Sequence, residues 1–234
     1  MRINKLLSNL GYCSRREANR WIEDGRLTVN GQICQLGQWL EDADEVLLDE
    51  QALVPKDKIY MLLNKPVGIT CTAEATTPDN IIGFLNFPEY IFPVGRLDKN
   101  SEGLMLLTND GELANQVLAA EHGHEKVYHV TVNRPFDAQF LEAMGQGVEI
   151  DGQKTKPCRL QRLEENQFQI ILSQGLNRQI RKMCLVFGFK VLKLKRIRIL
   201  NLELGALPIG QWRMLDASEL QTLREELANT NLQQ

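Results

Sequence analysis

The feature that most constrains this chain is a polar turn placed directly before a run of apolar residues. The turn holds Asp98 between Gly95 and Gly103, and the apolar run extends over residues 104–107. A second turn signal at residues 109–111 leads into a helical pattern that runs to about residue 120. This layout predicts a buried strand that fixes one carboxylate on a loop, although the ordinary role of such an aspartate is to form a turn or cap a helix.

The length of 234 residues accommodates a catalytic domain and a small additional module. A hydrophobic share of 43% supports a real core, and the net charge of -3 excludes a protein that coats nucleic acid through bulk charge. Any polyanion must therefore be bound by local basic patches.

Targeting and redox signals are also absent from the sequence. The five cysteines include no CxxC pair, which predicts reduced, mostly buried thiols and neither a disulfide framework nor a zinc module. No apolar run reaches the length of a membrane span, and the N-terminus has no apolar signal core, so we expect a cytoplasmic protein.

Residues 1–48 predict a small module of two helices and a short sheet. Apolar residues recur at helical spacing up to Leu10, and a second helix begins at a capping box of Ser14 and Glu17 and ends at Gly25. A hairpin turn at residues 30–31 and a strand at residues 46–48 follow.

This module carries the stretches SRREA and GRLTVNG, and it resembles the RNA-binding module named after ribosomal protein S-four. Asn4 and residues 42–44 depart mildly from the family pattern. An ordinary solvated surface is the alternative reading of its charges. The resemblance implies RNA contacts by basic and polar residues, namely Arg2, Lys5, Arg15, Arg16, Arg26 and Asn30.

Residues 49–58 are predicted to form a linker, and residues 59–234 a larger domain. The domain should open with a strand at residues 59–63, a tight turn at 64–68 and a return strand through Thr72, with a helix starting near Pro78. Beyond these we expect strands at 127–132, 168–172, 191–200 and 212–215, hairpin turns at 151–152 and near 166, and helices at 137–144, 177–187 and after Asp216.

No acidic residue occurs between Glu165 and Glu203. In this region Lys193 and Lys195 alternate with leucines, and the alternation slips between Lys195 and Arg196, which predicts a bulge or a strand end. We expect this region to bind the RNA backbone, with a charged sheet edge that prevents aggregation as the alternative.

Several common catalytic motifs are missing. No GxxxxGK[ST] loop, GxGxxG turn or GxSxG elbow occurs, so nucleotide hydrolysis, dinucleotide redox chemistry and an α/β-hydrolase elbow have no support. His122 and His124 have the spacing of a metal pair but lack a third ligand pattern, so no metal and no cofactor are expected.

The stretches GRLDKNSEGL, NKPVG, EKVYHVTV and GLNRQIR occur in one order along the chain. Together they resemble the ribosomal RNA pseudouridine synthases of the RsuA group, and the later part is similar to the RluF-type large-subunit enzymes. The resemblance implies an α+β fold, in which a small S-four-type α-L RNA-binding module precedes a catalytic domain with a mixed, mainly antiparallel sheet and flanking helices.

The resemblance also implies roles for single residues. Asp98 matches the nucleophilic aspartate, Tyr128 the tyrosine that stacks on the target uracil, and Arg181 the arginine that pairs with the aspartate. Arg96 matches a residue that helps to displace the base, Lys65 lies in the turn behind the active site, and both are expected to contact RNA. Further RNA contacts are expected from Arg178, Lys182, Lys193 and Lys195.

Physical chemistry supports one aspartate beside one arginine. Burial raises the pKa of a carboxyl by up to about 3 to 5 units above roughly 3.9, and a nearby arginine lowers it by about 1 to 3. Glycosidases that hydrolyse use two carboxylates because they also activate water, so a single aspartate suits an isomerisation better.

The sequence therefore predicts a monomeric enzyme that converts uridine to pseudouridine in a stem-loop of structured ribosomal RNA. The expected target is large-subunit RNA. Two alternatives stay open at this point. One is a non-catalytic RNA-binding or ribosome-assembly protein, and the other is a sister synthase that acts on transfer RNA or small-subunit RNA.

Overall fold

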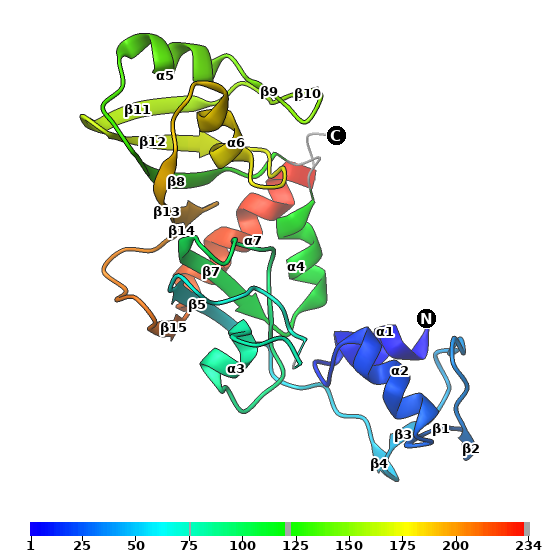
Figure 1. Cartoon of the computed structure of the whole chain (residues 1–234). Helices are drawn as coiled ribbons and strands as arrows, with labels where there is room; N and C mark the ends of the chain where they lie inside the picture. Colours follow the sequence, from blue (N-terminus) through cyan, green and yellow to red (C-terminus); the bar gives the residue numbers. More distant parts are fainter. Residues whose placement is uncertain (75, 120–122, 232–234) are drawn as a thin grey trace.

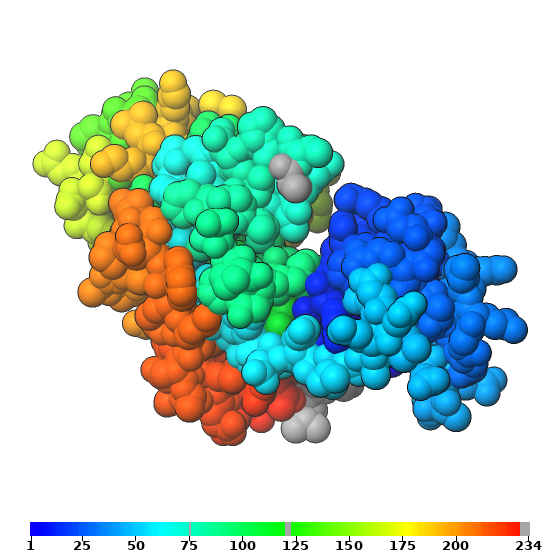
Figure 2. All heavy atoms as spheres, turned by 90° about the horizontal axis from the view of Figure 1, so that it is seen from below, coloured from blue at the N-terminus to red at the C-terminus, as the bar shows by residue number. Residues whose placement is uncertain are grey.

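The computed structural model describes residues 1–74, 76–119 and 123–231. Figure 1 shows a small N-terminal module joined to a larger domain, and Figure 2 shows the module standing out to one side of that domain. Within the described residues, no helix is long and apolar enough to cross a membrane.

The N-terminal module has the two helices and the sheet that the sequence predicts. The helices are α1 (Ile3–Asn9) and α2 (Arg15–Glu23), and the hydroxyl of Ser14 accepts a hydrogen bond from the backbone N–H of Glu17 at 3.1 Å. The strands are β1 (Leu27–Val29), β2 (Gln32–Ile33), β3 (Val46–Leu48) and β4 (Gln51–Ala52), in the order β2-β1-β3-β4.

Strand β4 lies inside the stretch predicted as a linker. It pairs antiparallel with β3, so the sheet of the module extends to Ala52. The rest of the predicted linker runs along the end of α1, where the N–H of Lys56 donates to the carbonyl of Leu10 at 2.9 Å and the ammonium of Lys58 donates to the carbonyl of Asn9 at 2.6 Å. These bonds tie the connection to the module.

The larger domain is built on one mixed sheet in the order β11-β12-β8-β13-β7-β5-β15. Its pairings are antiparallel except for β7 with β13, which agrees with the predicted fold class. The strands are β5 (Tyr60–Lys65), β6 (Phe92–Pro93), β7 (Glu102–Thr108), β8 (Lys126–Val132), β11 (Arg159–Glu164), β12 (Gln167–Leu172), β13 (Val191–Ile199), β14 (Leu202–Glu203) and β15 (Trp212–Met214), and a separate hairpin consists of β9 (Glu149–Ile150) and β10 (Gln153–Lys154).

Helices pack on both faces of one half of this sheet and also cover the other half. Alternate residues of β5 and β7 pack into two clusters, one with α4 (Gly111–Leu118) and α7 (Ala217–Asn231) and one with α3 (Ile81–Leu85) and the loops beside it. The other half, around β8 and β12, packs against α5 (Ala138–Gly145) and α6 (Gln179–Val186). Cys13, Cys34, Cys71 and Cys184 are buried free thiols, as predicted.

Two predicted elements differ in the structure. No return strand follows the turn at 64–68, because β5 pairs with β7 and β15 instead, and Thr70 makes only an isolated bridge with Asn80. The helix predicted to start near Pro78 starts at Ile81, since the side chain of Asn80 caps it by accepting from the N–H of Gly83 at 2.7 Å.

A narrow seam joins the two halves of the sheet. Strands β7 and β13 meet at only two pairs, Lys195 with Glu102 and Arg196 with Gly103. Gly103 has a φ of +109°, and a Cβ added there would lie 2.2 Å from the carbonyl oxygen of Arg196. The close approach therefore requires glycine at this position. The register of β13 against β8 shifts between Arg196 and Arg198, just after the predicted slip between Lys195 and Arg196.

Candidate active site

The loop that carries Asp98 leads into β7 and is fixed from several sides. The N–H of Ser101 donates to the carbonyl of Asp98 at 2.9 Å, and the N–H of Gly68 donates to the carbonyl of Lys99 at 2.8 Å. The buried ammonium of Lys65 donates to the carbonyls of Ser101 at 2.8 Å and Pro66 at 2.7 Å. The position of the carboxylate is thus set by backbone contacts.

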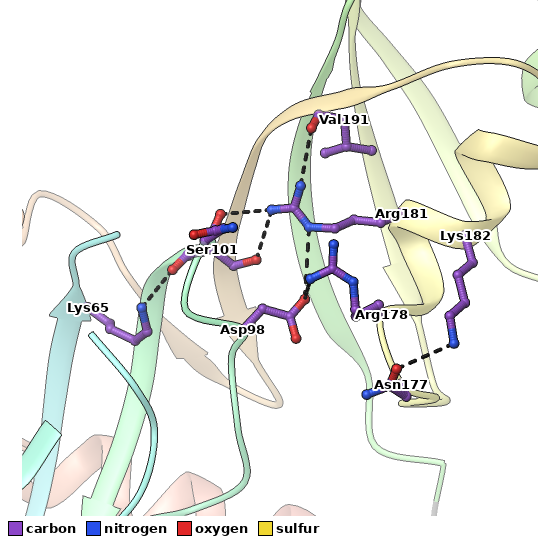
Figure 3. A network of polar contacts seen from close by, with 9 residues as sticks. Lys65, Asp98, Ser101, Asn177, Arg178, Arg181, Lys182 and Val191 are labelled. Carbon is purple, nitrogen blue, oxygen red and sulfur yellow. Dashed lines mark hydrogen bonds and ion pairs between the residues drawn. The ribbon is translucent and has the colours of Figure 1, made fainter. Parts of the chain in front are cut away.

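Two guanidinium groups face this carboxylate (Figure 3). The Oδ2 atom of Asp98 lies 3.7 Å from Nη1 of Arg178 and 3.9 Å from Nε of Arg181. Both distances are those of ion pairs and too long for hydrogen bonds. The Asp98 side chain keeps 31% of its surface exposed, so it is only partly buried in this structure.

Arg181 is held rigidly although its ion pair is loose. Its Nη1 donates to the carbonyl of Val191 at 3.2 Å, and its Nη2 donates to the carbonyl of Asn100 at 2.8 Å and to the hydroxyl of Ser101 at 3.2 Å. Among the described residues its buried Nε has no hydrogen-bond partner. Burial and the charge of Arg178 lower the pKa of Arg181, whereas Asp98 raises it. The N–H group at Nε of Arg181 is thus free to donate, and it points toward Asp98 (Figure 3).

Arg178 reaches the same carboxylate from a strained backbone. It immediately precedes α6 with φ 51° and ψ 33°, the left-handed region that costs a residue with a side chain about 1–2 kcal/mol. Its side chain is about half exposed, in contrast to the 14% exposure of Arg181. Arg178 is thus the cation at Asp98 that an incoming ligand would meet first.

Tyr128 lies at the centre of the sheet, on β8, and packs against the clusters of both halves. With Asp98, Arg178, Ile180 and Leu194 it lines a cavity of about 120 Å³. Arg96 is exposed at the same cavity, as its predicted contact with RNA requires. The structure therefore brings Asp98, Tyr128 and Arg181 together from three distant parts of the chain.

The prediction of an RNA contact is wrong for Lys65. Its side chain is fully buried, and the ammonium is used by the two carbonyls behind the Asp98 loop. Burial lowers the pKa of Lys65, while the charge of Asp98 is among those that raise it. Lys65 supports the loop and does not reach the surface.

Lys193 and Lys195, which are predicted to contact RNA, do not face the cavity that holds Asp98. In the β13–β8 pairing Lys195 is opposite His129 and Arg196 is opposite Tyr128, and successive side chains point to opposite faces. Lys195 lines a different surface hollow with His129 and Gln169. Lys193, opposite Thr131, shares that face. The basic residue of this strand that faces the cleft is Arg196.

The other residues predicted to contact RNA differ in whether their side chains already have partners within the protein. Lys182 pairs with Asp151 at 2.5 Å, and Arg26 pairs with Asp49 and lies over the ring of Trp21. The side chain of Asn30 braces its own hairpin by donating to Asp44 at 2.8 Å and accepting from the N–H of Glu45 at 3.0 Å. The exposed members of the predicted set in the module are Arg2, Lys5, Arg15, Arg16 and Asn30.

The described residues contain no group of His, Cys, Asp or Glu side chains that could hold a metal ion. His122, one member of the histidine pair noted in the sequence, lies outside the described residues. The Nδ1 atom of His124 is 3.1 Å from the carbonyl of Val117, which is a structural contact.

The sequence predicts only an RNA contact for Arg178, and it predicts no role for Lys126, which lies on β8 with Tyr128. Both lie inside stretches that carried the resemblance, GLNRQIR and EKVYHVTV. The motifs therefore contain both residues. The orientation of the Arg178 side chain depends on the left-handed backbone there, and that of Lys126 depends on strand register, neither of which residue spacing alone gives.

Comparison with known proteins identifies the class of enzyme. The family model for RNA pseudouridylate synthase matches residues 59–185, and the S4 domain model matches residues 1–46. The chain therefore belongs to the RNA pseudouridine synthase family, with an S4 domain at its N-terminal end, and it is an enzyme of that family.

Individual relatives extend over nearly the whole chain. The dual-specificity RNA pseudouridine synthase RluF of Escherichia coli O6:H1 is 45% identical, with 99% of this chain and 81% of the relative covered. The ribosomal large subunit pseudouridine synthase B of Bacillus subtilis is 32% identical, with 95% of each covered. A crystal structure of a pseudouridylate synthase superimposes with a TM-score of 0.70 at 30% identity, covering 95% of this chain and 99% of that one.

Proposed function

We propose that this enzyme isomerises a uridine in structured ribosomal RNA of the large subunit to pseudouridine. The observation that supports this most strongly is the Asp98 carboxylate between Arg178 and Arg181, beside Tyr128 in one cavity. The names of the relatives, which include a large-subunit enzyme, support the choice of RNA.

The reaction breaks the bond from ribose C1′ to N1 of uracil and joins C1′ to C5 of the same base. The proton on C5 is lost and N1 gains one, so the atoms balance without an external reagent. Asp98 serves as the carboxylate at the sugar, either as nucleophile or as the group that stabilises a cationic sugar. Arg181, whose free Nε points toward Asp98, supplies a fixed positive charge beside that carboxylate.

The target base must leave its stack to reach the cavity. Extraction of a base costs a few kcal/mol, and stacking on an aromatic ring returns roughly 1 to 3 kcal/mol. Tyr128 offers a partly buried ring on the wall of the cavity, and Arg96 lies at its exposed rim. The exposed basic residues of the S4 domain then bind phosphates and set the register of the RNA.

The proposed activity is tested with ribosomal RNA labelled with tritium at uridine C5. Incubation with the native chain should release tritium from large-subunit RNA and leave small-subunit RNA labelled. No release from any ribosomal RNA would contradict the proposal and favour a protein that only binds RNA.

A second RNA substrate is the specific alternative. The 45% identical relative is named a dual-specificity enzyme, and a 32% identical relative from Pasteurella multocida is named a small subunit enzyme. The same assay with labelled transfer RNA and small-subunit RNA separates one target class from two.

A further inference from the structure

A second and larger cavity adjoins the one that holds Asp98. Its volume is about 520 Å³, and it shares Arg96, Tyr128 and Leu176 with the smaller cavity. Beyond Tyr128 it is lined by Lys126 and Arg196, among others. The cleft therefore continues past the tyrosine into a basic chamber to which the reaction described above gives no task.

The two cations reach this chamber from neighbouring strands. Lys126 lies two residues before Tyr128 on β8, so both side chains point to the same face of the sheet. Arg196 is paired with Tyr128 in the register of β13 with β8, and it faces the same side. Strand register thus places Lys126, Tyr128 and Arg196 in one group.

Neither cation has an anionic partner among the described residues. Arg196 is only 3% exposed, and its Nε donates to the carbonyl of Leu104 at 2.8 Å while Nη2 lies 2.9 Å from the sulfur of Met105. Lys126 donates to the carbonyl of His124 at 3.0 Å. The adjacent Glu125 is engaged elsewhere, by Arg159 and by Arg198 at 3.1 Å. Burial and the charge of Arg196 lower the pKa of Lys126.

A buried cation next to a partly buried one, with no anion beside them, is costly, because each loses hydration and each repels the other. A structural explanation exists for Arg196, which ties β13 to the carbonyl of Leu104 across the seam. It does not extend to Lys126, which donates to a carbonyl only two residues away. An anionic ligand would relieve both costs at once.

We propose that the chamber is a phosphate-binding subsite, in which Lys126 and Arg196 hold the phosphodiester next to the target uridine. The inference rests on the proposed function for the identity of the RNA. A nucleotide whose base stacks on Tyr128 carries phosphates on both sides of its sugar, and the chamber begins at that ring. Neutralising the two cations there would fix the sugar against Asp98.

The first test uses inorganic phosphate as the probe and does not depend on catalysis. We expect phosphate to bind the native chain and to bind Lys126→Met about tenfold more weakly, since one charge-assisted contact is lost. The matched control is Lys195→Met, on the opposite face of the same sheet, and it should retain native affinity. Binding is measured by calorimetry at constant ionic strength. Equal phosphate affinity in the native chain and Lys126→Met overturns the subsite.

The second test uses RNA in which one phosphodiester is replaced by a neutral methylphosphonate on either side of the mapped uridine. At one of the two positions the replacement should weaken native binding about tenfold and leave the affinity of Lys126→Met unchanged. If the replacement weakens both proteins equally at both positions, the phosphodiester does not occupy the chamber, and a site for free phosphate only remains.

The outcomes separate this inference from the proposed function. If tritium is released but the methylphosphonate weakens RNA binding equally in the native chain and in Lys126→Met at both linkages, the subsite is contradicted and the proposed function is not. Absence of tritium release from every RNA contradicts the proposed function, while a tenfold weaker binding of phosphate by Lys126→Met would still support an anion site in the chamber.

Discussion

The cations of the N-terminal module and those of the catalytic cleft differ in exposure and in what holds them. Arg15 and Arg16 lie exposed on α2, and among the described residues neither forms an ion pair. Arg181 is 14% exposed and donates to three groups, and Arg196 is 3% exposed. Exposed cations attract RNA, and dissolved salt screens this attraction. Buried and anchored cations instead supply a positive charge at a fixed place.

The difference implies a division between affinity and catalysis. Changes in the module should weaken binding and leave the chemical step intact, and changes at Asp98 and Arg181 should slow the chemical step with little loss of affinity. Each prediction below tests whether that division holds.

Arg181→Met should lower kcat by about 100- to 1000-fold, since a fixed donor at the reacting carboxylate is removed. RNA affinity should change by less than about threefold, because Arg181 is largely enclosed by Val191, Asn100 and Ser101. Single-turnover tritium release and equilibrium binding measure the two quantities separately. A collapse of affinity with an unchanged rate would make Arg181 a phosphate contact.

Gly103→Ala should lower the free energy of unfolding by about 3 kcal/mol, because the new Cβ meets the carbonyl of Arg196 and the φ of +109° disfavours a side chain. Gly111→Ala is the matched control, with no atom within 4 Å of its added Cβ and no positive φ. Urea unfolding compares the two. Equal stability of both variants would show that the seam between β7 and β13 does not limit the fold.

Tyr128→Ala should lower kcat/KM by roughly 5- to 150-fold, the equivalent of the 1 to 3 kcal/mol that base stacking supplies. Tyr128→Phe keeps the ring and removes the hydroxyl, so it isolates stacking from proton transfer. A full rate in Tyr128→Phe assigns the residue to stacking. A loss as large as that of Tyr128→Ala would instead give the phenol a chemical role.

The double change Arg15→Gln with Arg16→Gln should weaken RNA binding by about tenfold at moderate salt and leave the single-turnover rate unchanged. Loss of two phosphate contacts should also reduce the slope of log affinity against log salt by about 1.4 to 1.8. Lys193→Gln with Lys195→Gln removes the same charge from the face away from the cleft, and it should change affinity less than twofold. Equal effects of the two pairs would contradict the proposed path of the RNA.

Motifs in the sequence were sufficient to predict which residues lie together at the candidate site. Asp98, Tyr128 and Arg181 were expected in one place, and they line or adjoin one cavity. Helix ends with local signals were also predictable, since the helix expected after Asp216 begins with a capping box that Asp216 and Glu219 form through bonds of 2.8 and 3.0 Å.

Features that depend on distant pairing could not be predicted. The prediction of a return strand after residues 64–68 was wrong because β7 and β15 pair with the two edges of β5. Local turn residues do not reveal this pairing. The direction of Lys193 and Lys195 is set by the register of β13 against β8. An alternating sequence gives two faces but does not say which one meets the active site.

The central claim is that the carboxylate of Asp98 performs the chemistry and does not serve RNA binding. The most direct measurement is single-turnover tritium release by Asp98→Asn with protein in excess over labelled RNA, together with the dissociation constant of the complex. We predict a rate at least about 10⁴-fold below the native rate, with affinity within about threefold. Release at the native rate from Asp98→Asn would contradict the account.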